Sequence, residues 1–210
     1  MCAHPNLVLA DHPLAGHLLA GLRDTKTSPE RFRVLAKRLA TVLVLEATRN
    51  LAVRDATVRT PLADAPARLI GTMVVAVPVL RAGLGMLETV TELLPDVQVG
   101  YVGLERDETT LQPTSYYLKV PQLAGAAVLL LDPMLATGGS AAFAATLLKQ
   151  RGAADLQLVC VVAAPEGVRR MADEHPDVRV VTAALDDHLN EVGYIVPGLG
   201  DFGDRLFGTF

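Results

Sequence analysis

Short runs of apolar, largely β-branched residues recur along this chain of 210 residues, and segments with helical spacing separate most of them. The runs are Met73–Val77, Val97–Leu104, Val128–Leu131, Leu158–Ala163 and Val178–Ala184. A run that is apolar at almost every position is typical of a strand buried on both faces. The alternation predicts an α/β fold built on a doubly wound, mostly parallel sheet.

Helix signals lie between these runs. Ser28 followed by Pro29 and Glu30 is typical of a helix start, and apolar residues at three- and four-residue steps extend that helix to about Asn50. Further helices are predicted at Leu84–Leu94, Ser140–Arg151 and Gly167–Glu174. The whole chain, residues 1–210, is expected to form one domain.

Two segments break the alternation. Residues 106–122 connect two predicted strands without a helix, so we expect a projecting loop or hairpin. Residues 185–210 are rich in Gly and Asp and show no clear period. Loops of this size often carry function.

Composition narrows the function classes. The net charge is −4, and aromatic residues make up 4% of the chain with no Trp. This argues against a nucleic-acid partner, because such proteins carry basic stripes or stacking aromatics. No stretch approaches the roughly 20 apolar residues of a membrane span. We therefore expect a cytoplasmic protein without a membrane segment, in which Cys160, inside an apolar run, is a buried and unreactive thiol.

One loop of small residues connects a predicted strand to a predicted helix. Gly138 and Gly139 let backbone N–H groups approach an anion, Thr137 and Ser140 add hydroxyl donors, and the helix contributes its positive end. Asp132, where the strand ends, can accept hydrogen bonds from sugar hydroxyls. Phosphate and diol together indicate a phosphoribosyl group, although an ordinary tight turn is the alternative. The residues are Asp132, Pro133, Met134, Leu135, Ala136, Thr137, Gly138, Gly139 and Ser140.

Phosphate motifs of other classes do not match. No Lys follows the glycine pair, as a P-loop requires, and Glu88 stands where a dinucleotide fingerprint beginning at Gly83 needs its third glycine. Arg81 follows another predicted strand, and its planar guanidinium suits a pyrophosphate. Arg106 lies at a third strand exit. The alternatives are a turn-capping surface arginine for Arg81 and a solvated charge cluster for Arg106.

These motifs together resemble those of the uracil phosphoribosyltransferases, which have the type I phosphoribosyltransferase fold. Asp132–Ser140 resembles the family's phosphoribosyl-pyrophosphate (PRPP) signature, and Arg81–Met86, Ala163–Gly167 and Gly193–Arg205 resemble its other motifs. The resemblance covers nearly the whole chain. It implies transfer of the phosphoribosyl group of PRPP to N1 of uracil, giving UMP and pyrophosphate.

The resemblance also implies residue roles. Asp132–Ser140 would hold the ribose and 5′-phosphate, Arg81 and Arg106 the pyrophosphate, and Asp201 would face PRPP and Mg²⁺. Asp201, Arg106 and Asp132 are thus the candidate catalytic residues. Mg²⁺ is expected to bind mainly through PRPP and water rather than through a protein metal site. Uracil would be read, largely by backbone groups, at Tyr194, Ile195, Gly200, Asp201 and Phe202.

Other properties follow from the same resemblance. It implies that the arm at 106–122 closes over PRPP or contacts a partner subunit, and that 185–210 form the base-binding region. A homodimer or higher homo-oligomer is expected, with GTP as a candidate effector. A non-proline cis peptide is expected near Arg81.

Two other functions fit the same fold. A non-catalytic, nucleotide-sensing RNA-binding regulator is one, and the acidic composition argues against it. A phosphoribosyltransferase for a purine or orotate is the other, and the complete C-terminal motif argues against it. Glu166 is interpreted as a first-turn helix acid, with the edge of the active site as the alternative.

Overall fold

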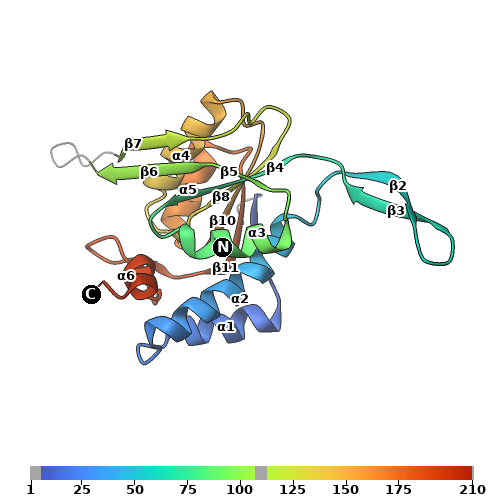
Figure 1. The fold of residues 1–210 in the computed structure, drawn as a ribbon. Helices are drawn as coiled ribbons and strands as arrows, with labels where there is room; N and C mark the ends of the chain where they lie inside the picture. Colours follow the sequence, from blue (N-terminus) through green and yellow to red (C-terminus); the bar gives the residue numbers. More distant parts are fainter. Residues whose placement is uncertain (1–5, 107–112, 210) are drawn as a thin grey trace.

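The computed structural model describes residues 6–106 and 113–209, and its centre is a mostly parallel 9-stranded sheet (Figure 1). The order is β1-β11-β10-β8-β4-β6-β7, and only β7 runs antiparallel to its neighbour. Short β5 (Gln98–Val99) pairs with β4, and β9 (Met134–Leu135) pairs with β10. The main strands are β1 (Leu7–Leu9), β4 (Val74–Leu80), β6 (Tyr101–Arg106), β7 (Pro113–Lys119), β8 (Ala127–Leu131), β10 (Asp155–Ala163) and β11 (Arg179–Leu185).

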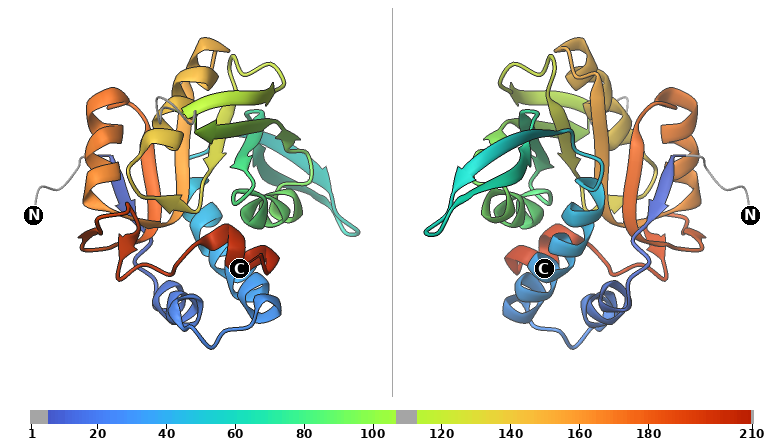
Figure 2. Two further views of the ribbon diagram at one scale, coloured as in Figure 1. Left: turned by 90° about the vertical axis from the view of Figure 1, so that its left-hand side faces the viewer. Right: turned by 90° about the vertical axis from the view of Figure 1, so that its right-hand side faces the viewer.

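Helices cover both faces of this sheet (Figure 2). On one face lie α1 (Pro13–Arg23), α2 (Pro29–Ala47), α3 (Leu84–Leu93) and α6 (Phe202–Phe207), and on the other lie α4 (Gly139–Gln150) and α5 (Pro165–Glu174). A hydrophobic core lies on each face of the sheet, and strand β4 contributes to both. Its residues Val74 and Ala76 pack on the first face, and Val75 and Val77 pack on the second. Burial on both faces explains the uninterrupted apolar runs.

The predicted strands and helices are all present, although several boundaries differ: β4 continues to Leu80, β10 begins at Asp155 and α5 begins at Pro165. The strand predicted at 97–104 is divided at Gly100 into β5 and β6, where the chain approaches Val120 so closely that a Cβ would lie 2.7 Å from its Cγ1. The helix that begins after Ser28 ends at Ala47, with Thr48 as its C-cap, rather than near Asn50. The expected burial of Cys160 is confirmed, and it raises the pKa of the thiol to about 12.

The hairpin expected at 106–122 is present as the antiparallel pair β6 and β7, while residues 107–112 lie outside the described residues. A different hairpin, which the sequence analysis missed, projects from the body (Figure 1). It consists of β2 (Val53–Arg59) and β3 (Asp64–Ile70), which among the described strands pair only with each other. Strand β3 contains Pro66, which a two-stranded ribbon tolerates because both of its strands are edge strands.

The C-terminal region is more regular than its composition indicated. Residues 185–210 contain β12 (His188–Leu189), β13 (Ile195–Val196) and α6. Helix α6 is short, but Asp201 caps it and Phe202 anchors it in the core. Within the described ranges, no helix combines the length and apolarity needed to cross a membrane.

Candidate active site

The carboxyl ends of β4 and β8 lie side by side where the order of the sheet reverses. From β4 the chain continues through α3 to one side, and from β8 it continues through α4 to the other. Open α/β sheets bind ligands at such a switch point. A cavity of about 200 Å³ opens here, and both loops line it through Arg81, Asp132 and residues 134–140, among others.

The loop after β8 is shaped to receive an anion. Gly138 has φ 77°, in the left-handed region, and a Cβ there would lie 3.0 Å from the carbonyl oxygen of Gly167. Helix α4 begins at Gly139 without a side-chain cap and without an acidic residue in its first turn. The N–H groups of its first turn and the positive end of its dipole therefore lie at the cavity, and no acidic side chain in that turn neutralises them.

Asp132 stands at the entrance to this loop. Its carboxylate is partly buried and accepts a weak hydrogen bond from the backbone N–H of Met134 at 3.5 Å. Burial raises the pKa of Asp132 to about 6, and the Met134 contact only partly opposes that effect. The carboxylate is thus ionised at neutral pH but poorly solvated, which favours contact with a hydroxyl donor or a cation.

Arg81 follows β4 directly across the cavity. The Leu80–Arg81 peptide bond is cis, as expected. The side chain is 63% exposed, lies 3.8 Å from a carboxylate oxygen of Asp204 and stacks 5.8 Å from the ring centre of Phe207. Among the described residues Arg81 makes this one long ion pair, which leaves most of its guanidinium donors available for an anion.

The predicted base-binding residues belong to a neighbouring region. Gly200 and Asp201 line a second cavity of about 460 Å³. Asp201 accepts a hydrogen bond from the N–H of Asp204 at 2.8 Å and so caps α6. Ile195 is buried, whereas Tyr194 is exposed.

The side chain of Phe202 points away from both cavities. It is fully buried, and its ring meets Phe32 edge-on with 5.1 Å between ring centres. Residue 202 can therefore contact a base only through its backbone atoms. Helix α6 lies beside α2 in Figure 2, in agreement with this aromatic contact.

The structure brings together the predicted PRPP residues on the loops after β4 and β8. Arg81, Asp132, Met134, Leu135, Ala136, Thr137, Gly138, Gly139 and Ser140 line one cavity. Pro133 holds the loop in place, because its carbonyl accepts from the N–H groups of Val161 and Val162. Arg106 is the last residue of β6, at the border of the undescribed segment 107–112, so its side chain is not placed.

A buried ion pair beneath the C-terminal region was not predicted. Asp186 is 4% exposed, accepts from both terminal nitrogens of Arg23 (2.8 and 2.5 Å), and also accepts from the N–H of Gly198 at 2.9 Å. Arg23 in turn donates to the carbonyl of Gly198. Asp186 follows β11 directly, as Asp132 follows β8, so the strand-exit rule could have singled it out.

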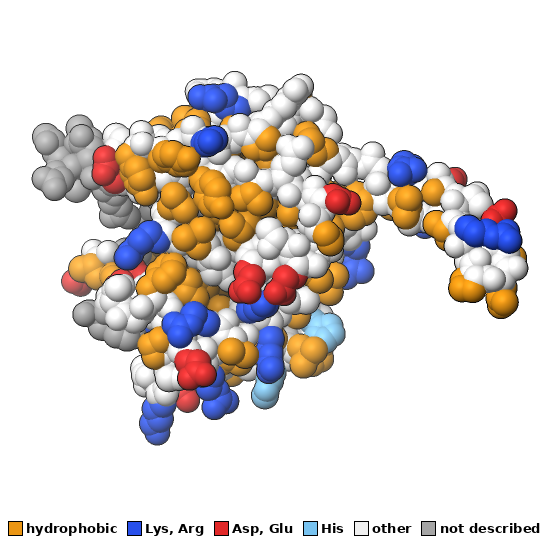
Figure 3. All heavy atoms as spheres, viewed as in Figure 1, with side chains coloured by type: hydrophobic (Ala, Val, Ile, Leu, Met, Phe, Trp, Pro, Cys, Tyr) orange, Lys and Arg blue, Asp and Glu red, His pale blue; other side chains and the backbone are white. Residues whose placement is uncertain are grey.

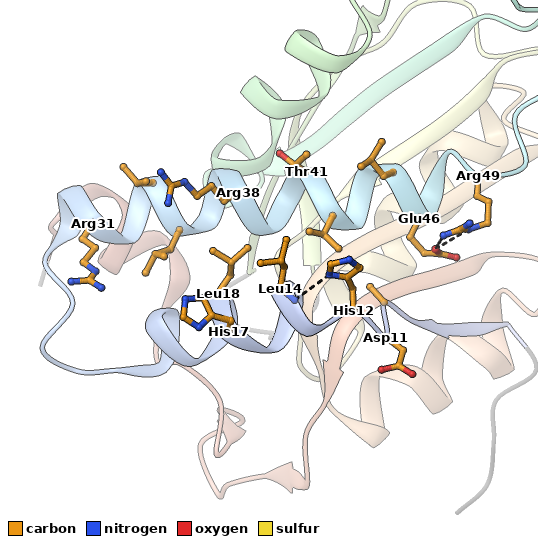
Figure 4. Close-up of a pocket in the computed structure, with 15 residues that line it drawn as sticks. Asp11, His12, Leu14, His17, Leu18, Arg31, Arg38, Thr41, Glu46 and Arg49 are labelled. Carbon is orange, nitrogen blue, oxygen red and sulfur yellow. Dashed lines mark hydrogen bonds and ion pairs between the residues drawn. The ribbon is translucent and has the colours of Figure 1, made fainter.

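A larger cavity lies elsewhere, between α1 and α2 (Figure 4), with a volume of about 900 Å³. None of the predicted site residues lines it. Its polar groups serve the helices: His12 accepts from the N–H of Leu14 at 3.1 Å, and Glu46 pairs with Arg49 at 2.6 Å. Size alone therefore does not identify the active site.

The sheet order and the phosphate loop at its switch point define a type I phosphoribosyltransferase fold. A hypoxanthine phosphoribosyltransferase from Trypanosoma cruzi shares this fold, with a TM-score of 0.51 and 14% identity over 77% of this chain and 76% of that one. A family model described as uracil phosphoribosyltransferase matches residues 8–209, so the chain belongs to that family.

Individual relatives agree. A uracil phosphoribosyltransferase from Thermus thermophilus is 50% identical over 205 residues, which cover 97% of this chain and 99% of that protein. The protein of the same name from Levilactobacillus brevis is 49% identical over 95% of this chain and 96% of its own. The AQ2163 protein from Aquifex aeolicus superposes with a TM-score of 0.90 at 38% identity, covering 97% and 98% of the two chains.

Proposed function

We propose that this protein transfers the phosphoribosyl group of PRPP to N1 of uracil, giving UMP and pyrophosphate. The observation that carries the proposal is the switch-point cavity, where a phosphate loop, a poorly solvated carboxylate and an exposed arginine meet. The full-length similarity to proteins named uracil phosphoribosyltransferase supports uracil as the base.

In this proposal each group acts at a different part of PRPP. The N–H groups of the loop at 137–140 bind the 5′-phosphate, and Asp132 accepts from the ribose hydroxyls. Arg81 and Arg106 bind the pyrophosphate and stabilise its charge as the bond to C1′ breaks. Uracil N1 then bonds to C1′ and releases its proton to solvent, while pyrophosphate leaves with the electron pair of the broken bond. Holding both substrates in line supplies much of the acceleration.

Magnesium fits this arrangement as part of the substrate. Asp132 and Asp201 offer carboxylate oxygens, which Mg²⁺ prefers, but residues 6–106 and 113–209 contain no cluster of three potential metal ligands. Mg²⁺ held by PRPP, water and Asp201 would neutralise charge on the departing pyrophosphate.

The first test offers uracil, cytosine, orotate and guanine in parallel with PRPP and Mg²⁺ and measures nucleotide formation. We expect turnover with uracil alone. A backbone pattern complementary to uracil leaves buried polar groups unpaired when cytosine replaces a carbonyl with an amino group, and such mismatches can cost on the order of 10⁴ in specificity. Turnover with another base but not uracil would refute the proposal.

The control for that assay is Asp201→Asn. Asn also caps helices well, so α6 should remain folded while the charge facing PRPP is lost. We expect kcat/KM to fall by on the order of 100-fold at unchanged thermal stability. If neither wild type nor variant converts any base while UMP still binds, the protein is a nucleotide-binding regulator instead.

We also propose that two copies associate through the ribbon of β2 and β3. Strand pairing places Arg54, Ala56 and Val58 opposite Leu69, Ala67 and Ala65, so one face is apolar apart from Arg54. The other face carries the charged residues Asp55, Arg59, Asp64 and Arg68. An isolated two-stranded ribbon is marginally stable in water, and Figure 3 shows this one standing clear of the body. Leu62, in the turn between its strands, is 92% exposed. A second copy would bury the apolar face.

Light scattering tests this assembly. The wild type should have at least twice the chain mass of 22.3 kDa. Val58→Asp with Leu69→Asp should reduce the mass to that of one chain, because two charges would enter the apolar face. The matched control, Thr57→Asp with Ile70→Asp, places the same charges on the opposite face and should keep the assembly. A monomeric wild type would contradict the proposal.

Two further proposals follow, the first from the composition and the second from the family resemblance. One is a cytoplasmic location, with which the free, buried thiol of Cys160 is compatible. The other is regulation by GTP, for which the readout is the initial rate of UMP formation with and without GTP at a fixed PRPP concentration.

A further inference from the structure

Glu166 lies between the phosphate loop and the C-terminal region, in the first turn of α5. It contributes to a favourable interaction with the helix dipole, as the sequence predicts. The Glu166 side chain also contacts a segment that is distant in the sequence. One carboxylate oxygen, Oε1, accepts a hydrogen bond from the backbone N–H of Leu189 at 3.2 Å, 23 residues along the chain.

The side of α5 next to Glu166 is packed against the phosphate loop. A Cβ on Gly167 would lie 2.5 Å from the carbonyl oxygen of Ala136, so the helix and the loop are in backbone contact. The N–H of Ala164, the N-cap residue of α5, donates to the carbonyl of Leu135 at 2.8 Å. The first turn of α5 and the phosphate loop therefore form one rigid unit.

Leu189 belongs to the unit that carries the predicted base-binding residues. It lies in β12 and pairs directly with Ile195 in β13. The turn between these strands approaches the phosphate loop, because a Cβ on Gly193 would lie 3.8 Å from Cγ2 of Thr137. The described contacts that tie β12 to α5 include the Glu166 hydrogen bond, which reaches the residue paired with Ile195.

The second oxygen of Glu166, Oε2, is buried and has no hydrogen-bond partner among the described residues. A buried carboxylate oxygen without a donor is costly, and a helix-capping role alone does not require one. The burial of Glu166 therefore points to a role beyond the helix dipole.

We infer that Glu166 is a positioning residue for the base: it fixes the β12–β13 segment relative to the phosphate loop so that uracil meets C1′ in line. This inference rests on the proposed function. The inference goes beyond the proposed function because it assigns a role in base affinity to a residue that contacts neither substrate.

The experiment compares Glu166→Ala, Glu166→Gln and Glu174→Ala. Glu174 ends the same helix and pairs with Arg170 at the surface, so its removal controls for losing an acidic side chain from α5. Glu166→Ala should raise KM for uracil roughly tenfold, the usual effect of losing one hydrogen bond to a charged group, and leave KM for PRPP within about twofold. Glu166→Gln keeps an acceptor for Leu189 and should restore uracil KM to near the wild-type value.

Amide hydrogen exchange at Leu189 provides a readout that does not depend on turnover. Exchange should become faster in Glu166→Ala and stay slow in Glu166→Gln and Glu174→Ala. Unchanged uracil KM and Leu189 exchange in Glu166→Ala would overturn the inference, as would equal rises in both KM values without rescue by Gln. A wild type that converts no uracil refutes the proposed function, while Glu166-dependent protection of Leu189 would still support the anchor.

Discussion

Replacing Gly83 with alanine is expected to lower the free energy of unfolding by about 3 kcal/mol and kcat/KM for PRPP by on the order of 100-fold. Gly83 lies just after Arg81, where the chain leaves β4. A Cβ there would overlap the carbonyl oxygen of Leu131, the residue before Asp132, and would lie 2.8 Å from both the N and the O of Val79. Backbone atoms cannot yield as a flexible side chain does, so the two strand exits must separate. Arg81 and Asp132 would then lose their mutual placement across the cavity.

Chemical denaturation and PRPP kinetics measure these two effects. The matched control is Gly16→Ala, in α1, where a new Cβ would meet nothing within 4 Å. That variant should gain up to about 1 kcal/mol, because alanine loses less backbone entropy in a helix than glycine does. Wild-type stability and PRPP kinetics in Gly83→Ala would show that the two exits are less closely packed than the structure has them.

The second large effect is expected for Asp132→Asn, and its two parts have opposite signs. Burial raises the pKa of Asp132 to about 6, so the ionised carboxylate destabilises the folded protein at neutral pH. In the folded protein the Asp132 carboxyl group stays protonated up to a higher pH than it does in the unfolded chain. Stability of the wild type relative to the variant therefore falls as the pH rises from about 4 to 6 and is level above that. At pH 8 the variant should be more stable by about 1–3 kcal/mol.

Activity should change in the other direction. Without the carboxylate, the proposed contacts to the ribose hydroxyls lose their charge, and kcat/KM for PRPP should fall by on the order of 100-fold. In the wild type, kcat/KM should also fall as the pH drops below about 6 and Asp132 is protonated. Denaturation curves between pH 4 and 8, with kinetics on the same samples, measure both parts. A variant that is less stable than the wild type at pH 8 would contradict the assigned cause of the raised pKa.

Elements whose signals are local could be predicted from the order of the residues. Strand β8 could be predicted because burial on both faces requires an apolar residue at nearly every position. The phosphate loop could be predicted because Asp132 through Ser140 are contiguous, and the glycines, hydroxyls and helix start that bind an anion all lie within that segment. Arg81 could be assigned to the same edge of the sheet because both strands are parallel and end there.

Features that depend on contacts between distant segments could not be predicted in this way. Arg23 and Asp186 are 163 residues apart, and nothing near either residue indicates that they pair. The same holds for Glu166 and Leu189, whose hydrogen bond exists because α5 and β12 pack together. Phe202 lies in a motif that implies base binding, yet its ring packs on Phe32. The orientation of an aromatic side chain depends on how the close-packed core accommodates it, and the motif does not show this. Local preferences specify each segment, whereas packing determines which segments meet and which faces remain exposed.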